Sequence, residues 1–262
     1  MPPMIATEAA ERLTPSGPPG RLDGRRAVVT GGGRGIGAEI ARRFVAEGAQ
    51  VAIIDVLPDT SAAAHSIGAL AVHGDLSDPA AAIAATRSAI DQLGGVDVLV
   101  NNAGILRFAP LLDITVEDWD LTFDVNVRSM LLTTQVGARA MIAAGHGGTV
   151  VNMASMGGKV GSPNQAHYAA SKAAVIGLTR VSAIELGVHG ITVNCICPGY
   201  VLTEMGAATR TSEMVAAWSA KSPLNRLAQP ADVANMALFL ASAEASYCTG
   251  QAMNVSGGMV MH

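Results

Sequence analysis

The chain has 262 residues, of which half are apolar, and carries a formal net charge of −4. This length and apolar content allow one sizeable core, and the acidic balance without a basic run argues against nucleic-acid binding. No apolar stretch approaches the roughly 20 residues that cross a membrane, and the three cysteines, which show no metal-ligand spacing, predict buried thiols in a reducing, cytoplasmic compartment.

Residues 1–21 contain acidic residues and several prolines but no apolar segment, so we predict a flexible N-terminal tail. Beyond it, short apolar runs alternate with Ala-rich amphipathic segments. The runs predict strands at 25–31, 50–56, 69–75, 96–104, 148–155, 191–199 and 251–258. The segments between them predict helices at 35–48, 59–67, 79–93, 115–144, 165–188 and 230–241.

This alternation covers 22–262 without a linker or a fixed repeat. It predicts one α/β domain, doubly wound, with about seven parallel strands and helices on both faces. The strand cores are almost continuously apolar, as expected for strands that are buried on both sides. The stretch 200–229 holds no predicted strand, and such excursions at the carboxyl edge of a sheet often contact substrates.

The first predicted strand runs directly into "TGGGRGIG" at 30–37 and then into a helix. Glycines allow a tight turn there and let backbone N–H groups approach a pyrophosphate at the helix N-terminus. A glycine-rich stretch alone is a weak signal, but its position between a strand and a helix is the one that a nucleotide site requires. We therefore predict a dinucleotide-binding loop.

Asp55 ends the second predicted strand. A carboxylate there can accept hydrogen bonds from a ribose diol and would repel a 2′-phosphate, although a helix cap is the alternative role. Arg34, inside the glycine loop, could instead meet a 2′-phosphate, but "DVLPD" (55–59) offers no second cation beside it. We predict NAD rather than NADP as the cofactor.

"HYAASK" at 167–172 places Tyr168 and Lys172 four residues apart, so both side chains lie on one face of a helix. The pair alone fits ordinary packing, with the tyrosine inward and the lysine in solvent. The pair indicates chemistry rather than packing when it occurs together with the glycine loop, with Asp55, and with Ser155, which ends the fifth predicted strand.

With "TGGGRGIG", "NNAG" at 101–104 and "YAASK" at 168–172 in this order, the chain from 22 to 262 resembles the short-chain dehydrogenase/reductase family. The resemblance implies a Rossmann-type fold and a catalytic quartet. The quartet would be Asn126, Ser155, Tyr168 and Lys172. Ser155 and Tyr168 would also bind substrate. One departure is Ala154, where many members carry a second serine.

The resemblance also implies a set of cofactor contacts. It places the pyrophosphate on the glycine loop, the adenine near an acidic residue after the third strand, and the nicotinamide carboxamide on "PGYVLT" at 198–203. The implied residues are Gly31, Arg34, Gly35, Ile36, Gly37, Asp55, Asp75, Leu76, Asn102, Tyr168, Lys172, Pro198, Val201 and Thr203. Position next to these motifs suggests a substrate pocket of Leu106, Met156, Gly157, Tyr200 and Met205.

In such a site Tyr168 would take the proton of an alcohol, for which a free phenol with a pKa of about 10 is a poor base near neutral pH. A cation about 4 Å away contributes up to roughly 4 kcal/mol, or about three pKa units. We therefore expect Lys172 to lower the pKa of Tyr168. Ser155 would donate a hydrogen bond to the substrate oxygen.

These features predict an oxidoreductase that moves a hydride between NAD(H) and a secondary alcohol or ketone. Similarity of "AMIAAGHGGTVVNMAS" (140–155) to polyol-type members favours a polyol or another small hydroxylated substrate. A 3-oxoacyl-thioester reductase is the alternative enzyme, because "QAMNVSGGMVMH" (251–262) looks like that group. A catalytically silent dinucleotide sensor is the alternative of another class. The resemblance further implies a homotetramer, with no membrane partner.

Overall fold

The computed structural model describes residues 20–204 and 211–262. Its centre is one parallel sheet of seven strands in the order β3-β2-β1-β4-β5-β6-β7. The strands are β1 (Arg26–Thr30), β2 (Gln50–Asp55), β3 (Leu70–His73), β4 (Val98–Asn101), β5 (Gly148–Met153), β6 (Ile191–Pro198) and β7 (Ala252–Val255). The predicted α/β class and the number of strands are confirmed.

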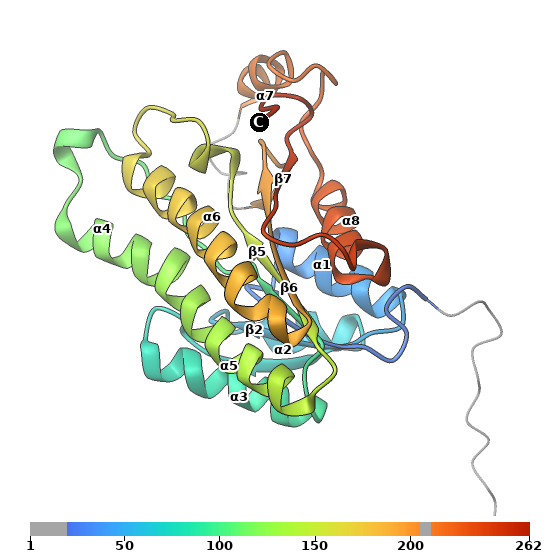
Figure 1. Cartoon of the computed structure of the whole chain (residues 1–262). Coiled ribbons are helices and arrows are strands. Elements are labelled where there is room, and N and C mark those ends of the chain that lie inside the picture. Colours follow the sequence, from blue (N-terminus) through green and yellow to red (C-terminus); the bar gives the residue numbers. More distant parts are fainter. Residues whose placement is uncertain (1–19, 205–210) are drawn as a thin grey trace, which may run out of the picture.

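Helices cover both faces of this sheet (Figure 1). One face packs against α1 (Gly35–Ala46) and α8 (Pro230–Ala241), and the other against α3 (Pro79–Leu93), α5 (Ser129–Ala144) and α6 (Ala166–Leu186). The shorter helices are α2 (Thr60–Ser66), α4 (Val116–Phe123) and α7 (Ser212–Ser219). No helix in the described part of the chain is long and apolar enough to cross a membrane.

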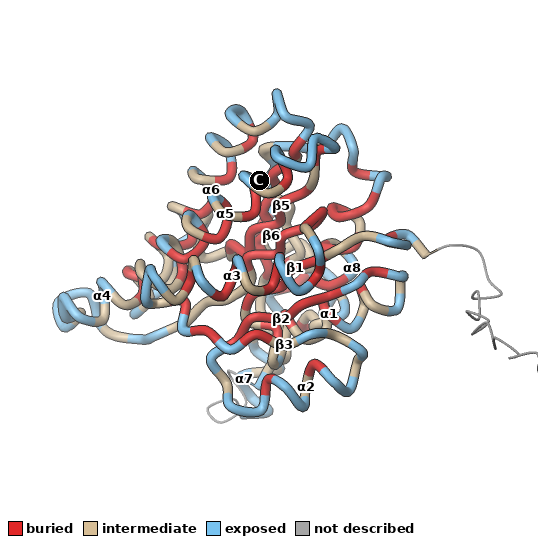
Figure 2. Tube along the Cα trace, turned by 90° about the horizontal axis from the view of Figure 1, so that it is seen from below, coloured by how far each residue is buried: buried red, intermediate tan, exposed pale blue. Residues whose placement is uncertain are grey.

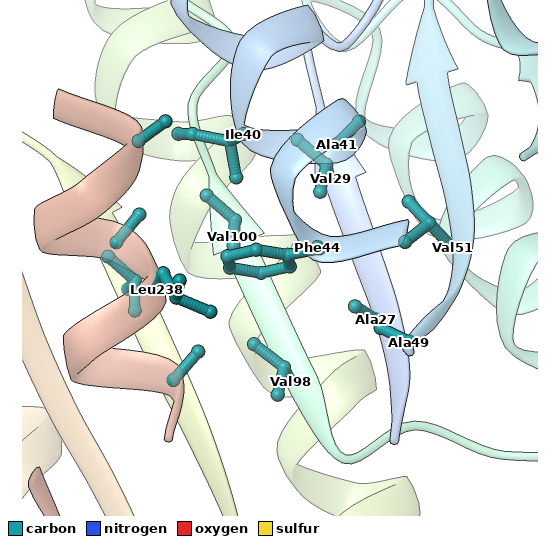
Figure 3. Packing of buried hydrophobic residues seen from close by; sticks show 14 of the residues in the cluster. Ala27, Val29, Ile40, Ala41, Phe44, Ala49, Val51, Val98, Val100 and Leu238 are labelled. Atoms are coloured by element: carbon teal, nitrogen blue, oxygen red, sulfur yellow. The ribbon is translucent and has the colours of Figure 1, made fainter. Parts of the chain in front are cut away.

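Alternate residues of a strand supply the two halves of the core, because successive side chains point to opposite faces. Ala27 and Val29 of β1 join the cluster under α1 and α8, whereas Val28 between them joins the cluster under α3 and α5. Phe44 of α1 fills the first cluster, near Leu238 of α8 (Figure 3). Figure 2 shows the consequence: buried residues concentrate along the strands, and exposed ones on the outer sides of the helices.

The order in which the chain adds strands to the sheet reverses at β1, which pairs with β2 on one side and with β4 on the other. Loops leaving the carboxyl ends of β1 and β4 therefore diverge and leave a crevice, which is where ligands bind in open α/β sheets. The glycine loop follows β1 and "NNAG" follows β4, so two of the predicted motifs meet at this point.

The helix predicted at 79–93 is confirmed as α3, whereas two other local predictions need correction. Asp78 caps α3 by accepting a hydrogen bond from Ala81 N at 2.7 Å, with Pro79 in the first turn. The continuous helix predicted at 115–144 is instead α4 and α5 joined by a π-helical segment, η2 (Asp124–Arg128). Its apolar pattern could not reveal the extra residue in one turn. The predicted strand at 96–104 is shorter, because "NNAG" leaves the sheet after Asn101.

Candidate active site

The glycine loop has the backbone that its sequence requires. Gly31 and Gly35 adopt φ values of 63° and 58°, in the left-handed region that disfavours other residues. At Gly37 a side chain has no room, since a Cβ would lie 2.0 Å from Gly31 O. The first amides of α1, at Gly35, Ile36 and Gly37, receive no side-chain cap. They are therefore available to an anion.

Asp55 closes this loop against the end of β2. Its Oδ2 accepts a hydrogen bond from Gly33 N at 2.8 Å, and its Oδ1 accepts from Val56 N and Leu57 N at 2.8 and 3.2 Å. The alternative role as a helix cap is wrong, because α2 begins after Asp59. A carboxylate has about four acceptor sites. Three are used, which leaves capacity for a hydroxyl donor.

The stretch after β6 reaches the glycine loop. A cavity of about 390 Å³ lies between Gly32–Gly35 and a wall that includes Leu202, Thr203 and Glu204. Arg34 lines it and is exposed. Pro198 ends β6, and Val201 forms an isolated bridge with Ala228. The structure thus brings Leu202 and Thr203 of the predicted segment beside the loop, whereas Met205 lies outside the described residues.

Three other predicted cofactor residues have less direct roles. Asn102 Nδ2 donates to Thr30 O and Gly31 O at 3.1 and 2.9 Å, so the side chain braces the end of β1. Asp75 is exposed, and its Oδ1 accepts from Ser77 Oγ at 2.8 Å. Leu76 is buried in the core. Any ligand contact of Leu76 would therefore involve its main chain.

Ser155 follows β5 and faces the first turn of α6. Its Oγ accepts a hydrogen bond from Gly157 N at 3.0 Å, which caps the 3₁₀ turn η3 (Met156–Gly158). A hydroxyl that accepts in this way keeps its own proton for donation. The Ser155 hydroxyl also interacts with the phenol of Tyr168.

Tyr168 and Lys172 lie one turn apart on α6, as the spacing predicts. Lys172 is buried, its Nζ lies 5.7 Å from the centroid of the Tyr168 ring, and it donates to Met153 O at 2.8 Å. An ammonium has three donors, so the carbonyl of Met153 leaves others for a ligand.

The protonation of this pair differs from the expectation. Burial raises the pKa of Tyr168 above its ordinary value, and Ser155 opposes the rise. Burial also lowers the pKa of Lys172 to about 8, against the effect of the Cys197 and Cys195 thiols. The expected lowering of the Tyr168 pKa by Lys172 is therefore not found, because burial of the phenol is the larger effect.

Asn126 lies within the π-helical segment and is fully buried. Its Oδ1 accepts from Ile105 N at 2.8 Å, and its Nδ2 donates to Ile105 O and Ser171 Oγ, each at 3.0 Å. The π turn thus fixes α4–α5 to the loop after β4 and to α6. Segments of this kind are frequent at functional sites.

Sequence reasoning missed two contributors. A Cβ at Gly104 would lie 3.2 Å from Asn126 Oδ1 and 3.3 Å from Lys172 Nζ, so the absent side chain lets these two groups approach the same stretch of backbone. The "NNAG" motif includes this glycine, but the sequence did not indicate why a glycine is needed there. The carbonyl of Met153 is the other contributor, and a backbone acceptor leaves no signal in residue identity.

The fold and the site together define a class of protein. It is a doubly wound α/β protein whose glycine loop can bind an anion at the crevice. A serine, a tyrosine and a lysine lie close together beyond the end of β5. Among residues 20–204 and 211–262, no cluster of His, Cys, Asp or Glu could hold a metal ion. Residues 31–260 match the family model described as enoyl-(acyl carrier protein) reductase.

Proteins of similar sequence indicate which activities occur within that class. The sorbitol dehydrogenase of Cereibacter sphaeroides and the galactitol 2-dehydrogenase of Agrobacterium fabrum are 41% and 39% identical over 251 residues, which cover 91% of this chain and 98% of each protein. A 3-oxoacyl-(acyl-carrier-protein) reductase of Staphylococcus aureus is 37% identical over 244 residues, 90% of this chain and 98% of that protein. A short-chain type dehydrogenase/reductase from Mycobacterium marinum superposes with a TM-score of 0.86 at 36% identity, over 92% of this chain and 97% of that one.

The chain therefore belongs to the short-chain dehydrogenase/reductase family. It is an oxidoreductase that acts on CH–OH groups with a nicotinamide dinucleotide as cofactor.

Proposed function

We propose that this enzyme oxidises a secondary alcohol of a polyol or a similar small hydroxylated compound, with NAD as the hydride acceptor. One observation carries the chemistry: Ser155, Tyr168 and Lys172 gather at the carboxyl edge of β5. Similarity to two dehydrogenases of sugar alcohols supports the substrate class.

Each side chain has a separate task in this proposal. Tyr168 takes the hydroxyl proton of the substrate. Ser155 donates a hydrogen bond to the substrate oxygen, because accepting from Gly157 N does not involve the proton of its own hydroxyl. Lys172 offers its remaining donors to the hydroxyls of the nicotinamide ribose. Asn126 holds the loop at Ile105 in place beside the lysine.

Two observations support binding of a dinucleotide at the glycine loop. The N-terminus of α1 has no side-chain cap, and it borders the cavity of about 390 Å³. When bound, the cofactor accepts the hydride. Gly31, Arg34 and Gly35–Gly37 would hold its pyrophosphate, Asp75 and Leu76 its adenine side, and Pro198, Val201 and Thr203 its carboxamide end. Asn102 would act through the loop that it braces.

Turnover on a panel of substrates tests the function. We expect kcat/KM to be highest for oxidation of a polyol such as D-sorbitol or galactitol with NAD. The panel includes secondary alcohols and acetoacetyl thioesters, each with both cofactors. Similarity to the Staphylococcus aureus enzyme makes thioester reduction the second candidate. Fastest turnover of the thioester with NADPH would replace our proposal by that reductase, and cofactor binding without any turnover would indicate a sensor.

Replacement of Asp55 by asparagine tests the preference for NAD. The Asp55 carboxylate is held by three backbone amides, so it cannot swing away from a 2′-phosphate. Removing one negative charge should shift the ratio of kcat/KM for NAD over NADP at least about tenfold toward NADP. Asp59→Asn is the matched control, since the Asp59 side chain makes no cap bond on the same loop. An unchanged ratio in Asp55→Asn would remove the basis for NAD.

We also propose a homotetramer. Large apolar side chains are exposed on α4 and at the end of α6, among them Val116, Trp119, Val181, Ile184 and Val188. Exposed apolar patches mark interaction sites, and closed symmetric assemblies are the common solution. Light scattering should give the mass of four chains. A monomer at micromolar concentration contradicts this assembly.

A further inference from the structure

Two consecutive glycines follow the residue after Ser155, and only one of them is explained by packing. Gly158 lies against α6, where a Cβ would come within 2.6 Å of Lys172 C and 2.8 Å of Ala173 N. Both are main-chain atoms of a helix and cannot move aside. Gly158 is therefore required for α6 to approach the end of β5.

Close packing does not explain the glycine at position 157. It lies within a 3₁₀ turn, and its φ is outside the left-handed region. A Cβ on Gly157 would lie 3.4 Å from Ser155 Oγ and 3.5 and 3.7 Å from Cε1 and Cδ1 of Tyr168. These are ordinary van der Waals distances, so the fold tolerates a methyl group here. The missing side chain leaves space, and that space borders the two groups that hold the substrate oxygen.

The position of this space follows from the chemistry of the site. A reacting alcohol has its oxygen near Ser155 and Tyr168, and its hydrogen must face the nicotinamide. Both constraints fix the directions of the two remaining substituents on the reacting carbon. A substituent that passes along the serine and the edge of the tyrosine ring would meet Gly157.

We propose that Gly157 is a specificity-determining residue: its missing side chain makes room for the longer substituent on the reacting carbon. The substrates selected in this way are secondary alcohols with an extended chain on that side, such as an internal carbinol of a hydroxylated chain. A primary alcohol or 2-propanol does not use the space. This inference rests on the proposed function and adds the shape of its substrate.

The test compares Gly157→Ala with the wild type on the two enantiomers of 2-pentanol, on 2-propanol and on the polyol with the highest kcat/KM. We expect kcat/KM to fall about tenfold or more for the polyol and for the enantiomer whose propyl chain points to Gly157, because one added methyl in a pocket costs that much. The other enantiomer and 2-propanol should stay within about threefold. Gly187→Ala, at the far end of α6 where a Cβ meets nothing within 4 Å, should leave all four values unchanged.

Each other outcome counts against the inference. Equal losses for both enantiomers would mean that the methyl disturbs Ser155 or Tyr168 rather than the substrate. If both enantiomers kept the wild-type kcat/KM, no substituent would use the space. A fall in Tm of more than about 5 °C in Gly157→Ala would show that the fold does require this glycine. Failure of the wild type on every alcohol would instead overturn the proposed function, on which the inference depends.

Discussion

Replacing Tyr168 with phenylalanine should lower kcat for alcohol oxidation by about 10³-fold, within the range typical for loss of a positioned proton acceptor. The change removes one oxygen and keeps the ring, so the packing of α6 and the dinucleotide site should persist. The measurement is steady-state turnover together with a fluorescence titration of NADH. We expect kcat to collapse while the Kd for NADH stays within about twofold.

Tyr247→Phe is the matched control, because Tyr247 is fully exposed on the surface. It loses the same oxygen and should turn over at the wild-type rate. Residual activity in Tyr168→Phe close to that of Tyr247→Phe would assign the proton transfer to another group.

Replacing Lys172 with methionine should change how the activity depends on pH. Lys172 has a pKa of about 8, and the pKa of Tyr168 lies above its ordinary value. Since the two groups interact, their first proton is lost by the pair. The state without that proton includes the form with phenolate and ammonium, which can accept a proton from the alcohol. In the wild type kcat/KM should therefore be low at acidic pH and rise with an apparent pKa near the value for Lys172.

Without the lysine only a buried phenol remains, and its proton leaves at high pH. The rise in kcat/KM of Lys172→Met should move above about pH 10, with a loss of at least about 10²-fold at pH 7. The measurement is kcat/KM from about pH 6 to about pH 10, since this ratio reports groups of the free enzyme. Lys221→Met, at an exposed position, is the control. A rise at the same pH in Lys172→Met would show that Tyr168 does not depend on the lysine.

The sheet could be predicted because buried parallel strands have almost continuous apolar cores, and the short loops between elements allow few topologies. Strand ends were predicted less well. Asn101 stays in the sheet and Asn102 leaves it, although the two residues are identical in type. The π turn at Asn126 escaped prediction because one inserted residue hardly alters the apolar pattern of a helix. Within this segment Asn126 is held by contacts with Ile105 and Ser171, which are distant in sequence.

The sequence alone was enough to predict the class of this protein and the residues that we propose for its chemistry, because short motifs with fixed spacing record local geometry. The glycine loop and the Tyr168–Lys172 interval are of this kind. Only the tertiary structure decided how these groups behave. The pKa directions of Tyr168 and Lys172 depend on exclusion of water by the whole fold. The acceptor for Lys172 is a main-chain oxygen, and the space at Gly157 is set by α6 and β5 together. Burial and backbone contacts are properties of packed segments, and no spacing within one segment encodes them.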